Sequence, residues 1–318
     1  MTRVGLVLGA GGVVGQAFHA GVLAALENDL KWDPRNADVI VGTSAGSITG
    51  SLLRGGVPAS ELAAWTVRAP LAAEGKVLND LFGSHSPLFD PFQVADLLRL
   101  PSLPSASMIR RAIARPWRFR PLPAALALLG AGWRDVRPHV EAVGSVTDDQ
   151  WPRRDLWVCA VRRSDGRRIV FGRAGTAEVP LRLAVAASCS VPGYFAPVTI
   201  GRDAYIDGGA HSPTNAATLR SENLDLVIIV SPMSGPNGLR PDPLTGARWH
   251  AARLLRREVR ALRSRGTSVV VFEPGRDEQA LIGNDFMNGS RVHEIVQASF
   301  LAAGARASRP EVRRSLTF

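Results

Sequence analysis

The segment that most constrains this chain is a short buried-strand pattern that runs into a Gly-x-Ser-x-Gly turn. Residues 39–43 read Val-Ile-Val-Gly-Thr, Ser44 follows, and a helical pattern begins at Ala45. This order is typical of a nucleophile elbow, in which a serine sits on a strained turn and points out of the fold. The helix start directs unpaired N–H groups to the same place and favours negative charge there. Ordinary Gly/Ser turns also carry this five-residue pattern, so alone it leaves both interpretations open.

Two further turns add to this pattern. Residues 3–8 predict a buried strand, and Gly-Ala-Gly-Gly-Val-Val-Gly at positions 9–15 leads from it into a helical pattern. A glycine-rich turn before a helix can cradle an anion. Downstream, residues 204–206 predict a strand that ends in Asp207-Gly208-Gly209. We expect this acid at the exit of its strand, where open α/β sheets place their chemistry.

The three turns together resemble those of the patatin-like phospholipase family. So does Ala187–Val198, a small-residue helix that leads into Pro-x-x-Phe-x-Pro. The resemblance covers roughly residues 4–55 and 155–230. It implies a three-layer α/β/α sandwich with a mostly parallel central sheet. It also implies a Ser/Asp dyad in which the aspartate itself takes the proton.

The resemblance assigns a role to several residues. Ser44 is the expected nucleophile and Asp207 the expected base. Gly11 and Gly12 are expected to form the oxyanion hole, since N–H donors aimed at the developing charge are a large catalytic term. The family commonly has a basic residue after these glycines, and here Val13 occupies that place. Six further glycines are expected to shape the three turns: Gly9, Gly15, Gly42, Gly46, Gly208 and Gly209.

A histidine base is the alternative to the dyad, because a serine hydroxyl is a weak nucleophile without a base nearby. In α/β-hydrolases the chain order is Ser, acid, His. Three histidines follow Asp207 in that order: His211, His250 and His293. His211 is only four residues past Asp207, which leaves its ring little freedom to reach between the acid and Ser44.

Dinucleotide binding is the rival interpretation of the N-terminal loop, because Gly9-x-Gly11 begins the Rossmann fingerprint. The third glycine of that fingerprint falls on Val14, and no acidic residue ends the second strand. A P-loop is excluded because no Gly-Lys-Ser/Thr follows the glycines. No nucleotide, other organic cofactor or metal is therefore expected.

The remaining pattern predicts one domain over residues 1–318, with strands alternating with helices around a mostly parallel sheet that is covered on both faces. Residues 69–150 break this alternation with prolines and clustered arginines, and are expected to form a helical cap within the domain. Further elements are expected as strands at 155–161, 168–171, 225–230 and 269–272, and as helices at 181–188, 213–219, 244–265 and 290–306.

Composition limits the partners. The formal charge of +10 comes almost wholly from arginine, since Lys31 and Lys76 are the only lysines. Peripheral contact with an anionic membrane through the arginine-rich cap and the 248–265 helix is expected as readily as a solvated basic face, and no specific nucleic acid is expected. No apolar run is long enough to span a bilayer, and no secretion signal is apparent. Cys159 and Cys189 are expected to be packed thiols, which fits a cytoplasmic location.

The expected function is a serine acyl hydrolase that cleaves carboxylic esters of lipids, of the phospholipase A, lysophospholipase or lipid esterase type. Two alternatives remain from the sequence. The same acyl enzyme could pass its acyl group to an alcohol, or the chain could be a non-catalytic lipid-binding module.

Overall fold

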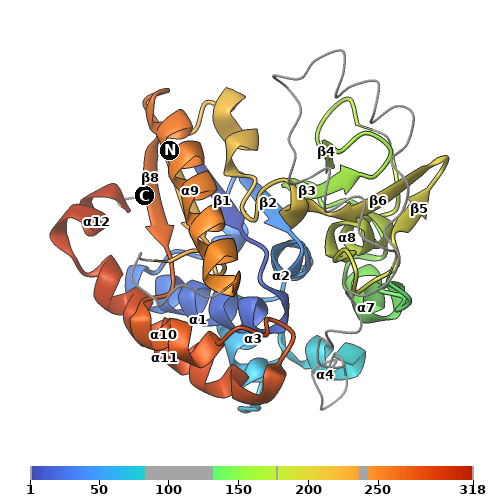
Figure 1. Ribbon diagram of the computed structural model, residues 1–318. Coiled ribbons are helices and arrows are strands. Elements are labelled where there is room, and N and C mark those ends of the chain that lie inside the picture. The colour runs from blue at the N-terminus through green and yellow to red at the C-terminus, as the bar shows by residue number, and fades with distance from the viewer. Residues whose placement is uncertain (1, 83–131, 177, 236–242, 317–318) are drawn as a thin grey trace.

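A computed structural model describes residues 2–82, 132–176, 178–235 and 243–316. Its centre is an eight-stranded sheet with the order β5-β6-β3-β2-β1-β7-β8, and β4 pairs with β3 (Figure 1). The strands are β1 Val4–Leu8, β2 Val39–Thr43, β3 Asp155–Arg162, β4 Arg167–Phe171, β5 Val198–Ile200, β6 Asp203–Asp207, β7 Leu226–Val230 and β8 Ser268–Phe272.

The middle of the sheet is parallel. β1 pairs in parallel with β2 and β7, β2 with β3, and β7 with β8. Every residue of β1, β2 and β7 is buried, as expected for parallel strands that are covered on both faces and read as continuous apolar runs. β4, β5 and β6 are antiparallel to their neighbours. The prediction of a mixed α/β fold with a mostly parallel sheet is confirmed.

Helices cover both faces of the sheet, which gives three layers (Figure 1). One face carries the larger apolar core, beneath α1 Gly12–Leu30, α2 Ala45–Arg54, α8 Leu181–Cys189 and α11 Val292–Ala307. The other face carries a smaller core beneath α9 Pro243–Arg263 and the 3₁₀ helix η5 Ala216–Ser221. In the described ranges, no helix is both long and apolar enough to cross a bilayer.

Some elements differ from the sequence-based expectation. The helix expected from residue 213 is instead a 3₁₀ helix that begins only at Ala216, because Asn215 before it adopts a left-handed backbone with φ 51°. Three short elements were not predicted: β5, α10 Arg276–Ile282 and α12 Pro310–Ser315. The 3₁₀ turns η1 Pro34–Asn36, η4 Gly208–Ala210 and η6 Gly289–Arg291 complete the connections.

Most of the predicted cap, residues 83–131, lies outside the described residues. The described residues next to it contain α4 Lys76–Phe82 and α7 Arg137–Thr147, and α3 Ala59–Thr66 precedes the region. The cap as a unit therefore stays a prediction.

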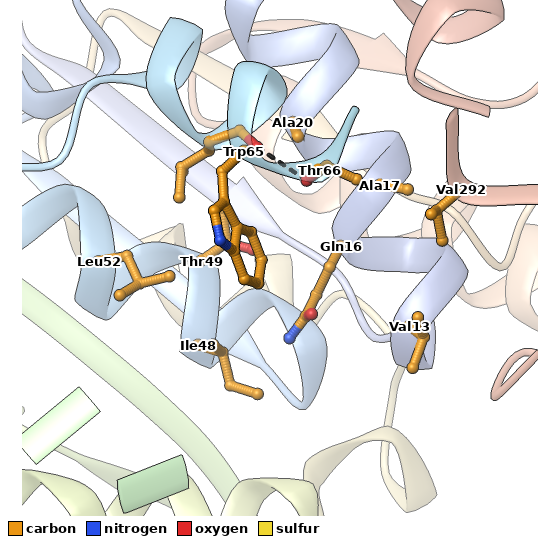
Figure 2. A pocket seen from close by; sticks show the side chains of 11 residues that line it. Val13, Gln16, Ala17, Ala20, Ile48, Thr49, Leu52, Trp65, Thr66 and Val292 are labelled. Carbon is orange, nitrogen blue, oxygen red and sulfur yellow. Dashed lines mark hydrogen bonds between the residues drawn. The ribbon is translucent and has the colours of Figure 1, made fainter. Parts of the chain in front are cut away.

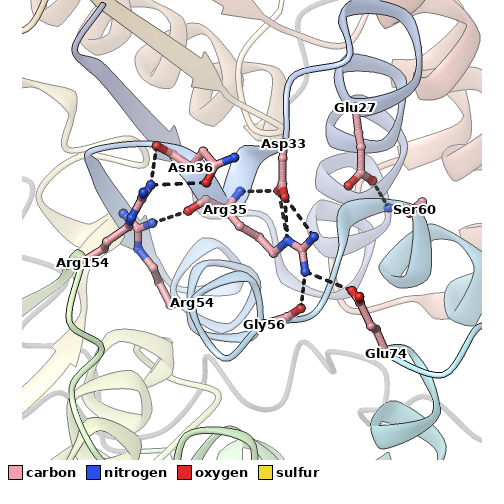
Figure 3. A network of polar contacts seen from close by, with 9 residues as sticks. All are labelled: Glu27, Asp33, Arg35, Asn36, Arg54, Gly56, Ser60, Glu74 and Arg154. Carbon is pink, nitrogen blue, oxygen red and sulfur yellow. Dashed lines mark hydrogen bonds and ion pairs between the residues drawn. The ribbon is translucent and has the colours of Figure 1, made fainter. Parts of the chain in front are cut away.

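A polar network holds the end of α2 that lies away from the elbow (Figure 3). The guanidinium of Arg54, the last residue of α2, donates to the backbone carbonyls of Arg35 and Ala37 at 2.8 Å and of Asp155 at 2.9 Å. Burial, followed by repulsion from Arg154, lowers the pKa of Arg54 to about 10. One side chain thus ties α2 to the segments that enter β2 and β3.

We expect Arg54→Ala to lower the free energy of unfolding by about 2 kcal/mol. The three carbonyls lose their shared donor, and their partly buried position limits how well water can replace it. Urea unfolding followed by circular dichroism measures this difference. Arg137→Ala is the matched control, since among the described residues Arg137 pairs with the exposed Asp135 and such pairs contribute less than about 1 kcal/mol. Equal losses in the two variants would contradict the prediction.

Candidate active site

The two halves of the candidate site meet along one edge of β3. The first part of β3 pairs with β2, and its last three residues pair with β6. β4 occupies the opposite edge over the same residues, so β2 and β6 share one edge and face each other end to end. Thr43 pairs with Cys159, and Asp207 pairs with the next residue, Ala160. Ser44, which follows Thr43, is thereby brought beside Asp207.

The direction of β6 is a feature of this arrangement that the sequence analysis does not include. Asp207 does stand at the exit of its strand, as expected, but β6 runs antiparallel to β3 and so approaches from the opposite direction. The reason is the length of β3: it has eight residues where β2 has five, and the surplus gives β6 an edge on which to pair.

Ser44 has the strained backbone of an elbow. Its φ is 54° and its ψ is −123°, a conformation that side-chain-bearing residues rarely adopt. Gly46 permits the tight turn, because a Cβ built there would lie 1.9 Å from the carbonyl oxygen of Leu8. The Ser44 N–H donates to Oγ of Ser188 at 2.9 Å, and that hydroxyl donates to the carbonyl of Cys159 at 2.7 Å. The turn is therefore anchored to α8 and β3.

Asp207 is a buried carboxylate to which few groups donate hydrogen bonds. Its side chain is within hydrogen-bonding reach of the Ser44 hydroxyl and accepts from the Gly209 N–H at 2.6 Å. Its own N–H donates to the carbonyl of Ser190 at 2.9 Å. Burial raises the pKa of Asp207 to about 6, while the bonds from Ser44 and Gly209 act in the opposite direction. The carboxylate is consequently a stronger base than an exposed aspartate.

The N-terminal glycine loop adjoins both turns. A Cβ built on Gly15 would lie 3.7 Å from the methyl group of Ala45 in the elbow helix, and one built on Gly209 would lie 3.4 Å from that of Ala10. The N–H groups of Gly9 and Ala10 donate to backbone carbonyls. Those of Gly11 and Gly12 have no acceptor in the described part of the chain. These two N–H groups therefore stay available for a negative charge, beside the first turn of α1.

The other glycines expected to shape the turns sit at close approaches. Gly208 passes beside β3, since a Cβ built there would lie 2.2 Å from the Cys159 carbonyl oxygen. Gly42 meets the first turn of α2, where a Cβ would lie 2.5 Å from Cα of Ser47. Gly9 is less confined, because its Cβ would lie 3.2 Å from the Val230 carbonyl oxygen. Gly12 has a φ of 58°, which favours glycine.

Asn215 links the two halves of the site and was missed in the sequence. Its side-chain amide donates to Oγ1 of Thr43 at 3.1 Å, to the carbonyl of Gly208 at 3.2 Å and to that of Ser212 at 2.6 Å. Arg168 donates to its side-chain oxygen at 3.3 Å. Asn215 is fully buried. One amide thus joins the residue before the serine to the residue after the aspartate.

Glu258 of α9 supports the loop that carries this asparagine. Its carboxylate accepts from the Thr214 hydroxyl and from the Ala216 N–H, the latter at 3.0 Å. Burial raises the pKa of Glu258, and hydrogen bonds from Thr214 and Ser212 oppose that shift. A buried acid of α9, on the face of the sheet with the smaller core, thereby fixes the residues on both sides of Asn215.

No histidine is among the groups that shift the pKa of Asp207. His19 is fully buried, which lowers its pKa to about 3, and its Nδ1 lies 3.3 Å from Oγ1 of Thr49. His211 follows the acid turn and donates its backbone N–H to the carbonyl of Gly208. In the described part of the chain, neither His250 nor His293 forms a hydrogen bond or ion pair with Ser44 or Asp207. Within the described ranges, the geometry gives the histidine alternative no support.

The two cysteines are free and buried, as predicted for packed thiols. Burial raises the pKa of Cys159 to about 12 and that of Cys189 further still. Both thiols therefore stay protonated near neutral pH. Among the described residues, no three His, Cys, Asp or Glu side chains are grouped so that they could hold a metal ion.

The model of one protein family matches residues 6–220, a range that contains all three turns. The chain belongs to the patatin-like phospholipase family. This confirms the resemblance drawn from the motifs, and membership of the family supports a lipid acyl hydrolase activity.

Two solved structures are similar to this patatin-like chain. The crystal structure of VipD from Legionella pneumophila matches with a TM-score of 0.39 and 12% identity, over 94% of this chain and 67% of that one. The type III effector protein ExoU matches with a TM-score of 0.40 and 16% identity, over 99% of this chain. The match spans 54% of the ExoU chain.

We expect Asn215→Ala to lower kcat by about tenfold or more with little change in KM, because the end-to-end junction loses the amide that spans it and small displacements of reacting groups are costly. Ester hydrolysis measured over a range of substrate concentrations separates the two parameters. Asn215→Ser, which restores a hydrogen-bonding group, should recover part of kcat.

Asn223→Ala serves as the control, because Asn223 is exposed and its backbone carbonyl, which accepts from Arg3, is kept in the variant. A proportional loss of folded protein and of activity in Asn215→Ala, with kcat per folded molecule unchanged, would refute the positioning role.

Proposed function

We propose that the protein is a serine acyl hydrolase that cleaves carboxylic esters of lipids through a Ser44/Asp207 dyad. The observation that carries this proposal is the end-to-end junction of β2 and β6, which brings a strained serine hydroxyl within reach of a buried carboxylate. The N–H groups of Gly11 and Gly12, which have no acceptor among the described residues, lie in the loop that adjoins both turns. Family membership supports the same class of activity.

In the proposed reaction, Asp207 takes the proton of the Ser44 hydroxyl while Oγ attacks the ester carbonyl carbon. The tetrahedral intermediate then collapses, the bond to the alcohol breaks, and the alcohol leaves with the proton from Asp207. Water attacks the resulting acyl serine and gives its proton to the same carboxylate. Release of the fatty acid restores the Ser44 hydroxyl, so the dyad acts as base and acid in turn.

The N–H groups of Gly11 and Gly12 are the proposed oxyanion donors. The carbonyl oxygen gains a full negative charge in the tetrahedral intermediate, and preorganised donors stabilise it without rearrangement. Loss of one such donor costs on the order of 10² to 10³ in kcat. Helix α1 begins within this loop, and helix α2 begins directly after Ser44. The dipoles of both helices favour the same negative charge.

We expect Ser44→Ala and Asp207→Asn each to remove hydrolysis of p-nitrophenyl esters, because the first lacks the nucleophile and the second lacks the base. A fluorophosphonate probe should label the native protein at Ser44, as located by peptide mass mapping. Asp207→Asn should slow this labelling strongly. Native-like turnover in either folded variant would disprove the dyad.

The pH profile gives a second readout of the same prediction. Asp207 acts as a base only when ionised, so kcat/KM should rise with pH up to about 6, the pKa of Asp207, and level off above it. Below that pH it should fall about tenfold per unit. If a histidine were the base, replacing that histidine would abolish the hydrolysis. The variants His211→Gln, His250→Gln and His293→Gln decide this point.

We further propose peripheral contact with anionic membranes through the outer face of α9. Arg253, Arg256, Arg257 and Arg260 are exposed there at helical spacing, whereas the one acid among them, Glu258, is turned inward and buried. The outer face of this segment therefore carries one sign of charge. Each arginine near an anionic surface contributes roughly 1 kcal/mol to binding.

We expect Arg253, Arg257 and Arg260, changed together to Gln, to weaken binding to phosphatidylserine vesicles on the order of a hundredfold, since three such contributions are lost. Vesicle co-sedimentation at two salt concentrations measures this, and native binding should fall as salt rises. The control changes the exposed and scattered Arg202, Arg220 and Arg309 to Gln. Equal weakening by both triple variants would contradict a specific role for α9.

A further inference from the structure

An apolar pocket lies between α1, α2 and α3, with Val292 of α11 at its side (Figure 2). Its apolar lining includes Val13, Ala17, Ile48 and Leu52. The mechanism proposed above uses none of these side chains. The pocket therefore needs a separate explanation.

Two residues of the lining lie close in the chain to the proposed reacting groups. Val13 directly follows the proposed oxyanion donor Gly12, and Ile48 lies one helical turn after Ser44. α1 and α2 both start at the carboxyl ends of neighbouring parallel strands, so a groove between them leads away from the site. Leu52 is one turn beyond Ile48, about 6 Å farther along α2. The pocket thus lies along the two helices whose first turns carry the proposed oxyanion donors and follow the proposed nucleophile.

The polar groups of the lining are mostly satisfied within the protein. The hydroxyl of Thr49 donates to the carbonyl of Ala45 at 3.2 Å, and that of Thr66 donates to the carbonyl of Leu62 at 2.7 Å. Gln16 is half-buried, so its amide can keep contact with water. What the pocket offers a ligand is therefore chiefly apolar surface.

The size of the pocket limits what it can hold. The cavity volume is about 40 Å³, enough for roughly three waters. The indole of Trp65 extends from α3 toward α1 and α2 and bounds this space (Figure 2). The pocket therefore has room for a few methylene groups and not for a lipid head group.

We propose that this pocket receives the first methylenes of the acyl chain and that Trp65 limits the length of chain it accepts. The inference rests on the proposed acyl hydrolase function and adds the part of the substrate that is selected. In the native protein, kcat/KM then increases with chain length only until the pocket is filled, because every methylene seated in the pocket increases kcat/KM up to about fourfold for a soluble ester, and methylenes beyond Trp65 gain nothing.

The test compares p-nitrophenyl acetate, butyrate, hexanoate, octanoate and decanoate below the concentration at which each forms micelles. In the native protein, kcat/KM should rise from acetate to hexanoate and then level off or fall. Trp65→Ala should shift the maximum to octanoate or decanoate and leave acetate nearly unchanged. Thr66→Phe, which fills the pocket from a half-exposed position, should lower the ratio of hexanoate to acetate hydrolysis.

Trp249→Ala is the matched control, because Trp249 is exposed on α9 and is not part of the lining. Its profile should follow that of the native protein. Identical profiles in the native protein, Trp65→Ala and Thr66→Phe would overturn the inference while leaving the proposed hydrolase function intact.

Absence of turnover with every ester would instead refute the proposed function, and the pocket is then decided by binding alone. Hexanol should bind to Ser44→Ala in isothermal titration calorimetry and should bind at least tenfold more weakly when Thr66→Phe is added. Hexanol binding that is undetectable, or equal in the two variants, would overturn the pocket as a chain site.

Discussion

The candidate active site depends on one strand being longer than its neighbour. β3 continues for three residues past the end of β2, and β6 pairs with that extension on the edge that β2 has just left. Hydrogen bonding between strands thus fixes the ends of β2 and β6 against one common strand. Their last residues pair with consecutive residues of β3. Two residues separated by more than half of the chain gain a defined relation without a direct covalent or local link.

Keeping that junction closed requires buried polar groups, which are costly unless each finds partners. Asn215 and Ser188 are both fully buried. Asn215 donates to the Thr43 hydroxyl on one side of the junction and to the Gly208 carbonyl on the other, while Ser188 accepts from the Ser44 N–H and donates to the Cys159 carbonyl of β3. Glu258 accepts from the loop that carries Asn215. The strained backbone of Ser44 persists because these bonds, together with the close packing at Gly46, leave the turn no alternative path.

The local parts of this site could be predicted from the sequence, and the relations between them could not. The elbow, the glycine loop and the Asp-Gly-Gly turn are each contiguous patterns whose residue types have a conformational reason, so Ser44 and Asp207 stand out. The antiparallel course of β6 depends on which strand it pairs with, and a five-residue strand pattern does not carry that information. Asn215 was missed because it fell within a predicted helix. Its one local signal is the ease with which asparagine adopts the left-handed backbone seen here.

A carboxylate base constrains its surroundings differently from a histidine. Each N–H bond to an ionised carboxylate lowers its pKa, whereas burial raises it. Asp207 accepts one backbone N–H bond, from Gly209, and is otherwise enclosed, so burial prevails and the pKa rises to about 6. The glycine loop needs free N–H groups instead. An N–H group that already donates to a protein carbonyl cannot donate to the oxyanion. The proposed chemistry therefore needs an acid that accepts few hydrogen bonds beside a loop whose N–H groups are not bonded to the protein. The close approach of Gly209 to Ala10 sets the two next to each other.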